Sequence, residues 1–180
     1  VVAPSDAEDA KGLLIAAIRD DNPVVFIAHK LLMAKKGEVP DEEYVVPIGK
    51  AKIRREGKDV TLVSWSKMVL DTKAAAEELA EQGIDAEVID LRTIKPMDEE
   101  TLINSVKKTG RLVIVHEATR VNGFGAEIAA TVSEKAFEYL KAPILRVTAP
   151  DCPSPFSPVL EAAYLPNAEK IVEAVKSIVK

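Results

Sequence analysis

Apolar and polar positions follow two periodicities that take turns along almost the whole chain. Short segments rich in apolar residues, typical of strands in a parallel sheet, stand at residues 24–27, 60–63, 86–91, 112–115 and 144–147. Elsewhere apolar residues recur every three or four positions, which predicts helices at residues 5–19, 68–82, 98–109, 124–137 and 167–178. Strands separated by helices predict a mostly parallel sheet with helices on both faces, an α/β three-layer sandwich.

Capping and turn residues indicate where these elements begin and end. Ser5 stands three residues before Glu8, a capping box that opens the first helix, and Gly83 follows the second helix at the left-handed cap position. Residues 50–55 alternate like a strand, and a Gly-Lys-Asp turn joins them to the 60–63 strand. We therefore expect a hairpin, which makes one edge strand of the sheet antiparallel.

The stretch 31–46 differs in composition from both of its neighbours. It is rich in lysine and contains Gly37 and Pro40, followed by acidic residues. We interpret it as a linker between an N-terminal part, residues 1–30, and a larger domain, residues 47–180.

The N-terminal part has more apolar surface than one helix and one strand can bury. Its helix carries Leu14, Ile15 and Ile18 on one face, and its strand, 24–27, lacks the other strands of a sheet. We expect these surfaces either to lie bare or to be covered by a partner. Self-association or a partly disordered N-terminal segment would follow.

Composition and charge narrow the class of protein. Apolar residues make up 47% of the chain and charged residues 29%, which excludes disordered and fibrous proteins. The net charge of -5 is unlike that of a nucleic-acid-binding protein, and no apolar run reaches the ~20 residues of a membrane span. The N-terminus lacks the features of a signal peptide and begins like the middle of a fold, as a fragment would. Cys152 is the single cysteine, so we expect no internal disulfide and a reducing compartment such as the cytoplasm.

Few residues combine into a recognisable catalytic pattern. His116 and Glu117 end a predicted parallel strand, where ligands of open α/β sheets bind, so they are acid/base candidates. The alternative, which we favour, is a histidine hydrogen-bonded beside a helix N-terminus. Asp90 and Arg92 end a neighbouring strand, and they either form a buried pair, the favoured interpretation, or bind a ligand carboxylate.

Three further segments have both a functional and a structural interpretation. The stretch 122–125, Asn-Gly-Phe-Gly, either binds an anion at a helix N-terminus or allows close helix packing. The stretch 20–23, Asp-Asp-Asn-Pro, either coordinates a hard cation or forms a turn. Cys152 has no nearby base that would make it a nucleophile, and Trp65 is expected in the core. Composition and spacing alone therefore identify no active site.

The ordered segments resemble the β subunit of the thiamine-diphosphate-dependent 2-oxo acid dehydrogenases, the E1 component of pyruvate dehydrogenase and its relatives. The matching segments, in family order, are SDAEDAKGLLIAAIRDDNPVVF, KGEVP, VPIGKAKIRREGKDVTLVSW, AEVIDLRTIKPMDEETL, KTGRLVIVHEA, GFGAEIAA, APILRVTAPDCPSPFSP and LPNAEKIVEAVK. The resemblance implies that residues 1–30 end a pyrimidine-binding domain as a strand-helix-strand remnant. It implies that residues 47–180 form a transketolase-like C-terminal domain.

The resemblance also indicates which functional groups this chain lacks. The glutamate that activates the cofactor's aminopyrimidine and the active-site histidine of the β subunit lie upstream of the matching segments. Neither His29 nor His116 takes their place, so the isolated chain is expected to be inactive. The intact enzyme would use thiamine diphosphate and Mg²⁺.

A monovalent cation site, K⁺ in particular, is implied at the end of the first helix. Main-chain oxygens hold this cation in the family, and the matching positions are Ala17, Ile18, Asp20 and Asn22. A further ligand would come from the upstream part, so the site here would be incomplete. The chain also departs from the family at Ala28, where many members have a glutamate before the histidine.

The resemblance implies an E1 α subunit, a second β subunit and the peripheral subunit-binding domain of the E2 acyltransferase as partners. Glu161, Glu169 and Glu173 are candidate contacts to the basic face of the E2 domain. The expected function is therefore the dimerisation and E2-docking part of a 2-oxo acid, most simply pyruvate, dehydrogenase. It would act in the cytoplasm, or in the mitochondrial matrix of a eukaryote. The alternatives are an acetoin dehydrogenase β subunit and a non-catalytic binding module of the same fold.

Overall fold

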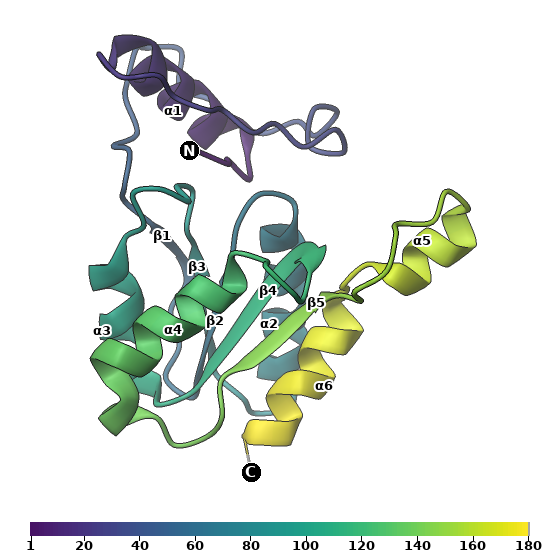
Figure 1. Cartoon of the computed structure of the whole chain (residues 1–180). Coiled ribbons are helices and arrows are strands. Elements are labelled where there is room, and N and C mark those ends of the chain that lie inside the picture. Colours follow the sequence, from purple (N-terminus) through teal and green to yellow (C-terminus); the bar gives the residue numbers. More distant parts are fainter. Residues whose placement is uncertain (180) are drawn as a thin grey trace.

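A computed structural model describes residues 1–179 of the chain, as an α/β domain with an additional N-terminal helix (Figure 1). The strands are β1 (Lys52–Arg55), β2 (Val60–Ser64), β3 (Ala86–Asp90), β4 (Leu112–Thr119) and β5 (Leu145–Ala149). The α-helices are α1 (Ala7–Arg19), α2 (Met68–Glu81), α3 (Glu99–Thr109), α4 (Gly125–Ala136), α5 (Pro158–Tyr164) and α6 (Ala168–Ile178). A short 3₁₀ turn, Phe137–Tyr139, follows α4.

The five strands form one sheet in the order β1-β3-β2-β4-β5. All neighbouring strands are parallel except β1, which pairs antiparallel with β3 at one edge. This confirms the predicted fold class, but the predicted hairpin is wrong, because β2 lies between β3 and β4 and does not pair with β1. The turn between β1 and β2 instead passes closely over β3, and Gly57 lies against the backbone of Ala86 and Glu87, where a side chain would clash.

Two helices cover each face of the sheet, and each face has its own apolar core. Helices α2 and α6 pack on one face, where the buried side chains include Leu62, Met68, Leu79 and Ile171. Helices α3 and α4 pack on the other face, over residues such as Ile89, Leu102, Ile114, Ile128 and Val132. Successive residues of a strand point to opposite faces, so Leu62 belongs to the first core and its neighbour Val63 to the second.

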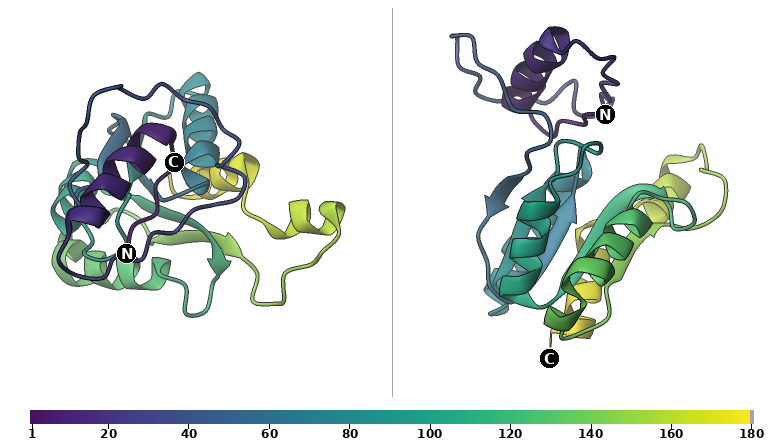
Figure 2. Two further views of the ribbon diagram at one scale, coloured as in Figure 1. Left: turned by 90° about the horizontal axis from the view of Figure 1, so that it is seen from above. Right: turned by 60° about the vertical axis from the view of Figure 1, so that its left-hand side comes forward.

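The N-terminal part lies over the carboxyl edge of the sheet (Figure 2). Its own apolar core contains three buried residues, Val2, Leu13 and Val46. The predicted buried strand at 24–27 is wrong, because only one parallel bridge forms, between Val2 and Phe26. Val25 and Ile27, which flank Phe26, remain exposed because no further strand is present to cover them.

Helix ends confirm most of the predicted caps and correct one. Asp6, not Ser5, caps α1 and accepts a hydrogen bond from the backbone N–H of Asp9, because the Ser5 hydroxyl donates to Asp90 instead. Asp98 caps α3 as predicted, and Gly110 ends that helix with φ 73°. Gly83, after α2, has the expected left-handed φ of 80°.

Two apolar groups on the surface were not foreseen. Phe137 is 73% exposed, because α4 ends at Ala136 and the 3₁₀ turn carries the ring away from the sheet. The short helix α5 and the loop before it project from the body of the domain, and Phe156 there is fully exposed (Figure 1). Leu14 and Ile18 on α1 are exposed, as the sequence indicates.

In the part of the chain that the structure describes, no helix is both long and apolar enough to cross a bilayer.

Candidate functional site

The topology singles out the crevice between the carboxyl ends of β2 and β4. These strands are neighbours, but the helices that follow them, α2 and α4, cover opposite faces of the sheet. In open α/β sheets such a switch point is where ligands bind. The residues that reach this crevice come from the end of β2, the end of β4 and the loop that opens α4.

His116 is enclosed at this switch point. Its side chain lies between the ring of Trp65, which stacks on it with ring centroids 5.4 Å apart, and the start of α4. The residue is 2% exposed, and neither ring nitrogen has a hydrogen-bond partner among the described residues. Burial, and then the positive charge of Arg146, lower the pKa of His116 to about 4. At neutral pH the imidazole is therefore uncharged, and these surroundings suit packing better than proton transfer.

The glycines of the 122–125 segment are required by this packing. A Cβ atom added at Gly125 would lie 2.5 Å from Nε2 of His116, and one added at Gly123 would lie 2.5 Å from its Cε1. Such contacts are shorter than real Cβ atoms make, so the imidazole and the first turn of α4 approach each other only because both positions lack a side chain. This geometry supports the close-packing interpretation of the segment.

Glu117 and His29 come together from distant parts of the chain. The Nε2 of His29 lies 3.0 Å from a carboxylate oxygen of Glu117, and both side chains are about a quarter exposed. The backbone N–H of Leu31 donates to Nδ1 of His29. Nδ1 thus accepts a hydrogen bond, and Nε2 makes the polar contact with the Glu117 carboxylate. Both nitrogens are thus committed, and the pair ties the segment after Phe26 to the end of β4.

Two serines at the end of β2 were missed by sequence reasoning. The hydroxyl oxygens of Ser64 and Ser66 are buried and have no hydrogen-bond partner among the described residues. Ser66 also adopts φ 53°, an unusual backbone conformation for a residue other than glycine. In the sequence, the two serines are marked only by their position at the end of an apolar strand. Serines are so common at strand ends that this position alone does not identify them as functional.

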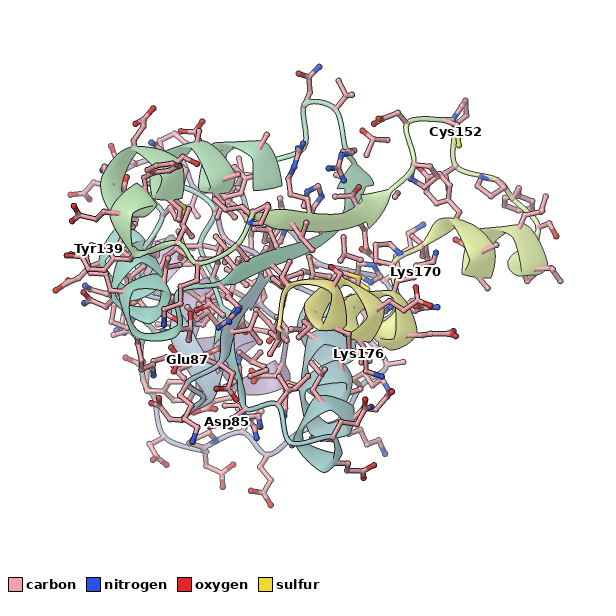
Figure 3. All side chains as sticks on the ribbon, turned by 90° about the horizontal axis from the view of Figure 1, so that it is seen from below. Asp85, Glu87, Tyr139, Cys152, Lys170 and Lys176 are labelled. Atoms are coloured by element: carbon pink, nitrogen blue, oxygen red, sulfur yellow. The ribbon has the colours of Figure 1, made fainter. Side chains whose placement is uncertain are left out.

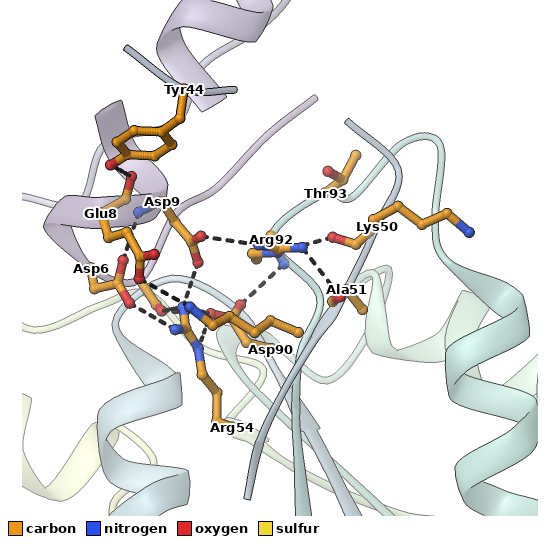
Figure 4. Close-up of polar contacts among 12 residues, drawn as sticks. Asp6, Glu8, Asp9, Tyr44, Lys50, Ala51, Arg54, Asp90, Arg92 and Thr93 are labelled. Atoms are coloured by element: carbon orange, nitrogen blue, oxygen red, sulfur yellow. Dashed lines mark hydrogen bonds and ion pairs between the residues drawn. The ribbon is translucent and has the colours of Figure 1, made fainter. Parts of the chain in front are cut away.

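A buried ion network joins the N-terminal part to the edge of the sheet (Figure 4). The Arg54 guanidinium contacts Asp90 at 2.8 Å, Asp9 at 2.5 Å and Asp6 at 2.8 Å, and also donates to the hydroxyl of Ser5. Burial alone would lower the pKa of Arg54, but the charges of Asp90, Asp6 and Asp9 outweigh it and raise the pKa. The three carboxylates therefore hold this arginine charged inside the interface.

Asp90 and Arg92 lie in the same network but do not pair through their side chains. Asp90 accepts from the backbone N–H of Arg92, whereas the Arg92 guanidinium binds Asp9 at 3.0 Å and the main-chain oxygens of Lys50 and Ala51. Burial raises the pKa of Asp90, against the opposing effects of Arg54 and Ser5. Both residues are therefore committed to contacts within the chain, but the buried Asp90–Arg92 side-chain pair that we favoured from the sequence does not form.

The end of α1 carries the residues at which the resemblance implies a monovalent cation site. The carbonyls of Ala17 and Ile18 lie in the last helical turn, where main-chain oxygens lack intrahelical partners. Asp20 accepts from the backbone and side-chain N–H groups of Asn22, and these hydrogen bonds lower the pKa of Asp20. Within residues 1–179 no group of three or more His, Cys, Asp or Glu side chains is arranged to hold a metal ion, so any such site depends on main-chain oxygens.

The remaining candidates lie on the surface, away from the crevice. Glu161 is exposed on α5, and Glu169 and Glu173 are exposed one turn apart on α6. Cys152 is exposed on the loop before α5 (Figure 3). Trp65, expected in the core, is only partly buried, because it covers His116 at the edge of the sheet.

Comparisons with known proteins show what this chain is similar to. It is 52% identical to the mitochondrial pyruvate dehydrogenase E1 component subunit beta of Dictyostelium discoideum, over 99% of this chain and 51% of that protein. It is 51% identical to the acetoin:2,6-dichlorophenolindophenol oxidoreductase subunit beta of Bacillus subtilis, over 95% of this chain and 50% of that protein. The chain therefore spans about half the length of these curated relatives.

The fold has a counterpart among solved structures. A split-gene transketolase, described as an inactive beta4 tetramer, superposes with a TM-score of 0.80 and 27% identity, over 99% of this chain and 56% of that one. The transketolase C-terminal domain family matches residues 49–171, which contain the whole five-stranded sheet. This chain belongs to the transketolase C-terminal domain family, and the resemblance to pyruvate dehydrogenase E1 β subunits is confirmed.

Proposed function

We propose that this chain is the C-terminal part of the β subunit of a pyruvate dehydrogenase E1 component. The observation that carries the proposal is its identity of about 50% to such β subunits along nearly its whole length. In the intact enzyme, thiamine diphosphate with Mg²⁺ would supply the decarboxylation chemistry, and the acyl group would pass to the lipoyl group of E2. The enzyme would act in the cytoplasm, or in the mitochondrial matrix of a eukaryote.

The residues of this chain would contribute structure and contacts rather than proton transfer. At neutral pH His116 is uncharged and enclosed, and both nitrogens of His29 are committed to Glu117 and Leu31. We expect the 180-residue chain to release no CO₂ from pyruvate when thiamine diphosphate and Mg²⁺ are added. A rate of CO₂ release above the rate measured without protein would show that residues of this chain do catalyse decarboxylation.

A pair of chimeras tests the main proposal. The part of the Bacillus subtilis pyruvate dehydrogenase β subunit that aligns with this chain is replaced by residues 1–180, and the same exchange is made in the acetoin enzyme of that organism. We expect each chimera to assemble with its own α subunit and to keep the substrate of its host. Chimeras that fold but neither assemble nor turn over substrate would refute the proposal.

An acetoin dehydrogenase β subunit is the closest alternative. The identities of 52% and 51% do not separate the two, so the substrate has to be decided by activity. The other alternative is a non-catalytic binding module of the same fold. Its signature would be small-ligand binding at the crevice together with no affinity for an E1 α subunit or an E2 domain.

Docking to the basic peripheral subunit-binding domain of E2 would involve the exposed acidic residues near the C-terminus. Neither Glu169 nor Glu173 forms an ion pair with a described residue, so both remain available to a cationic partner. We expect the Glu169→Lys/Glu173→Lys variant to weaken binding to that domain at least ten-fold, because each change reverses a charge. Glu81→Lys, an exposed position on α2, is the matched control, and an equal effect there would show only a response to net charge.

The end of α1 would hold K⁺ through the main-chain oxygens of Ala17, Ile18, Asp20 and Asn22. Because part of the coordination would come from the upstream half of the full-length subunit, the test belongs in the assembled chimera. We expect KCl to raise its melting temperature more than NaCl at equal ionic strength. An equal melting temperature in KCl and in NaCl would argue against the site.

A further inference from the structure

A cavity of about 420 Å³ lies between the start of α1, the segment 28–37 and α2. Its walls are mainly apolar: Phe26, Leu32 and Met33 line one side, and Leu70 of α2 lines another. Cavities of this size and lining commonly receive small molecules. This cavity is separate from the crevice that encloses His116, whose residues do not line it.

Most of the polar side chains around the cavity are already committed to other groups. Asp6 binds Arg54 and caps α1, and the hydroxyl of Ser5 donates to Asp90. His29 is bound to Glu117. These three groups therefore have little capacity left for a ligand.

Lys35 and Lys36 are the exception. Both line the cavity, and neither ammonium group forms an ion pair or a side-chain hydrogen bond with any residue of the described part of the chain. The nearby acidic residue Glu38 lines a different hollow, together with Glu8. Two lysines that lack an ion-pair partner in the described part of the chain thus line the cavity, in a chain whose net charge is -5.

We propose that this cavity binds a small apolar carboxylic acid. Its carboxylate would be held by the ammonium groups of Lys35 and Lys36, and its hydrocarbon part would lie against Phe26, Met33 and Leu70. Charge-assisted hydrogen bonds supply the selectivity for an anion, and removal of apolar surface from water supplies most of the affinity. The proposal is made for the 180-residue chain; in the full-length subunit proposed above, the rest of the pyrimidine-binding domain would adjoin residues 1–30, which form part of the cavity wall.

Binding would also order the segment that forms one wall. Residues 28–37 contain no helix or strand and are held by isolated turns, such as the bond from the Leu32 N–H to the His29 carbonyl. A ligand that touches this segment, α1 and α2 at once would stabilise their arrangement. Hydrogen exchange of the backbone amides in 28–37 should therefore slow when the ligand is bound.

Calorimetric titration of the 180-residue chain with sodium octanoate tests the proposal, with 1-octanol as the uncharged comparison. We expect one octanoate per chain, binding at least ten-fold tighter than octanol, and slower exchange in 28–37. The Lys35→Gln/Lys36→Gln variant should lose at least ten-fold in octanoate affinity, whereas Lys30→Gln, an exposed lysine that does not line the cavity, should not. Circular dichroism confirms that both variants are folded.

Other results would overturn the proposal. Equal affinity for octanoate and octanol, or an unchanged affinity in the double variant, would mean that the lysines do not select an anion. Absence of binding at millimolar octanoate would mean that the cavity does not accept this class of ligand. A dimer on size-exclusion chromatography that Met33→Glu converts to monomer would show that a second copy of the chain covers the cavity instead.

Discussion

Lowering the pH from 7.5 to 5.5 is expected to destabilise this chain through His116. In the native state the pKa of His116 is about 4, because burial and the nearby charge of Arg146 disfavour the imidazolium form. In the unfolded chain the pKa returns to about 6.5. The unfolded state therefore takes up a proton in this range and the native state does not. The stability that the neutral ring contributes is complete above pH 6.5 and is lost as the pH falls toward 4.

The size of the effect follows from the two pKa values of His116. Lowering the pH by one unit, well inside the interval between the two pKa values, reduces the unfolding free energy by about 1.4 kcal/mol. The reduction is smaller near pH 6.5, where His116 is only half protonated in the unfolded chain. Integrated from pH 7.5 to pH 5.5, the loss is about 1.3 kcal/mol. A domain of this size has a total stability of about 5–15 kcal/mol, so the loss is measurable.

Urea unfolding followed by circular dichroism, at both pH values, measures this loss. His116→Phe is the matched variant, because a phenyl ring can still stack on Trp65 and does not titrate. The difference between wild type and variant should change by about 1.3 kcal/mol between the two pH values. The protein has to be dilute at pH 5.5, because its isoelectric point is about 5.2.

An NMR titration provides a second, independent readout on the same residue. The Cε1 proton of His116 should keep its chemical shift from pH 7.5 to 5.5. If its midpoint lies near 6.5, or if His116→Phe loses as much stability on acidification as wild type, the argument from burial and missing hydrogen-bond partners is wrong.

Three further substitutions test the packing, the ion network and a helix cap by denaturant unfolding. Gly125→Ala should lower the unfolding free energy by about 1–3 kcal/mol, because the added Cβ would collide with the imidazole of His116. Gly37→Ala is the control, because its Cβ would make only an ordinary contact at 3.6 Å, and it should cost less than about 1 kcal/mol. Equal effects would contradict the packing argument. Arg54→Met should cost about 3–5 kcal/mol because it leaves the buried Asp90 without an ion-pair partner, and the exposed Arg19→Met less than about 1 kcal/mol; a mild effect of the first would show that water reaches the network. Burial alone would raise the pKa of Asp98, but hydrogen bonds from two backbone N–H groups hold that pKa below its usual value. Asp98→Ala should therefore cost about 1–2 kcal/mol of unfolding free energy at pH 7, and progressively less as the pH falls below about 4. A cost that does not change with pH would exclude a charged cap.

Local periodicity was sufficient to predict the sheet and most of its helices. The apolar runs at 60–63 and 112–115 lie within β2 and β4, because strands buried on both faces have few alternatives to a continuous apolar sequence. The partner of β1 was not predictable in the same way. A tight turn suggested β2, but the pairing is decided by the central place of β2 and by the close passage of Gly57 over β3, and both depend on the whole fold.

The candidate sites show the same division between local and long-range information. The rule that ligands bind at carboxyl ends of strands led to His116, but whether its nitrogens are free depends on residues 65 and 123–125, which only folding brings together. The network around Arg54 joins residues 36 and 45 positions apart, so no local pattern contains it. Helix α5 begins where a proline-rich stretch ends, and its 7 residues are too few for a periodic pattern to identify it.

The contrast between the cores of the two parts has a consequence for how the native state opens. With only three residues, Val2, Leu13 and Val46, the N-terminal core is too small to be stable alone, so that part depends on the ion network that attaches it to the sheet. Because Asp9 and Asp90 are almost fully buried, added salt screens these ion pairs much less than it screens pairs on the surface. We therefore expect α1 to be a separate cooperative unit that unfolds before the sheet, with amide exchange that is faster than that of β2 and changes little with added salt.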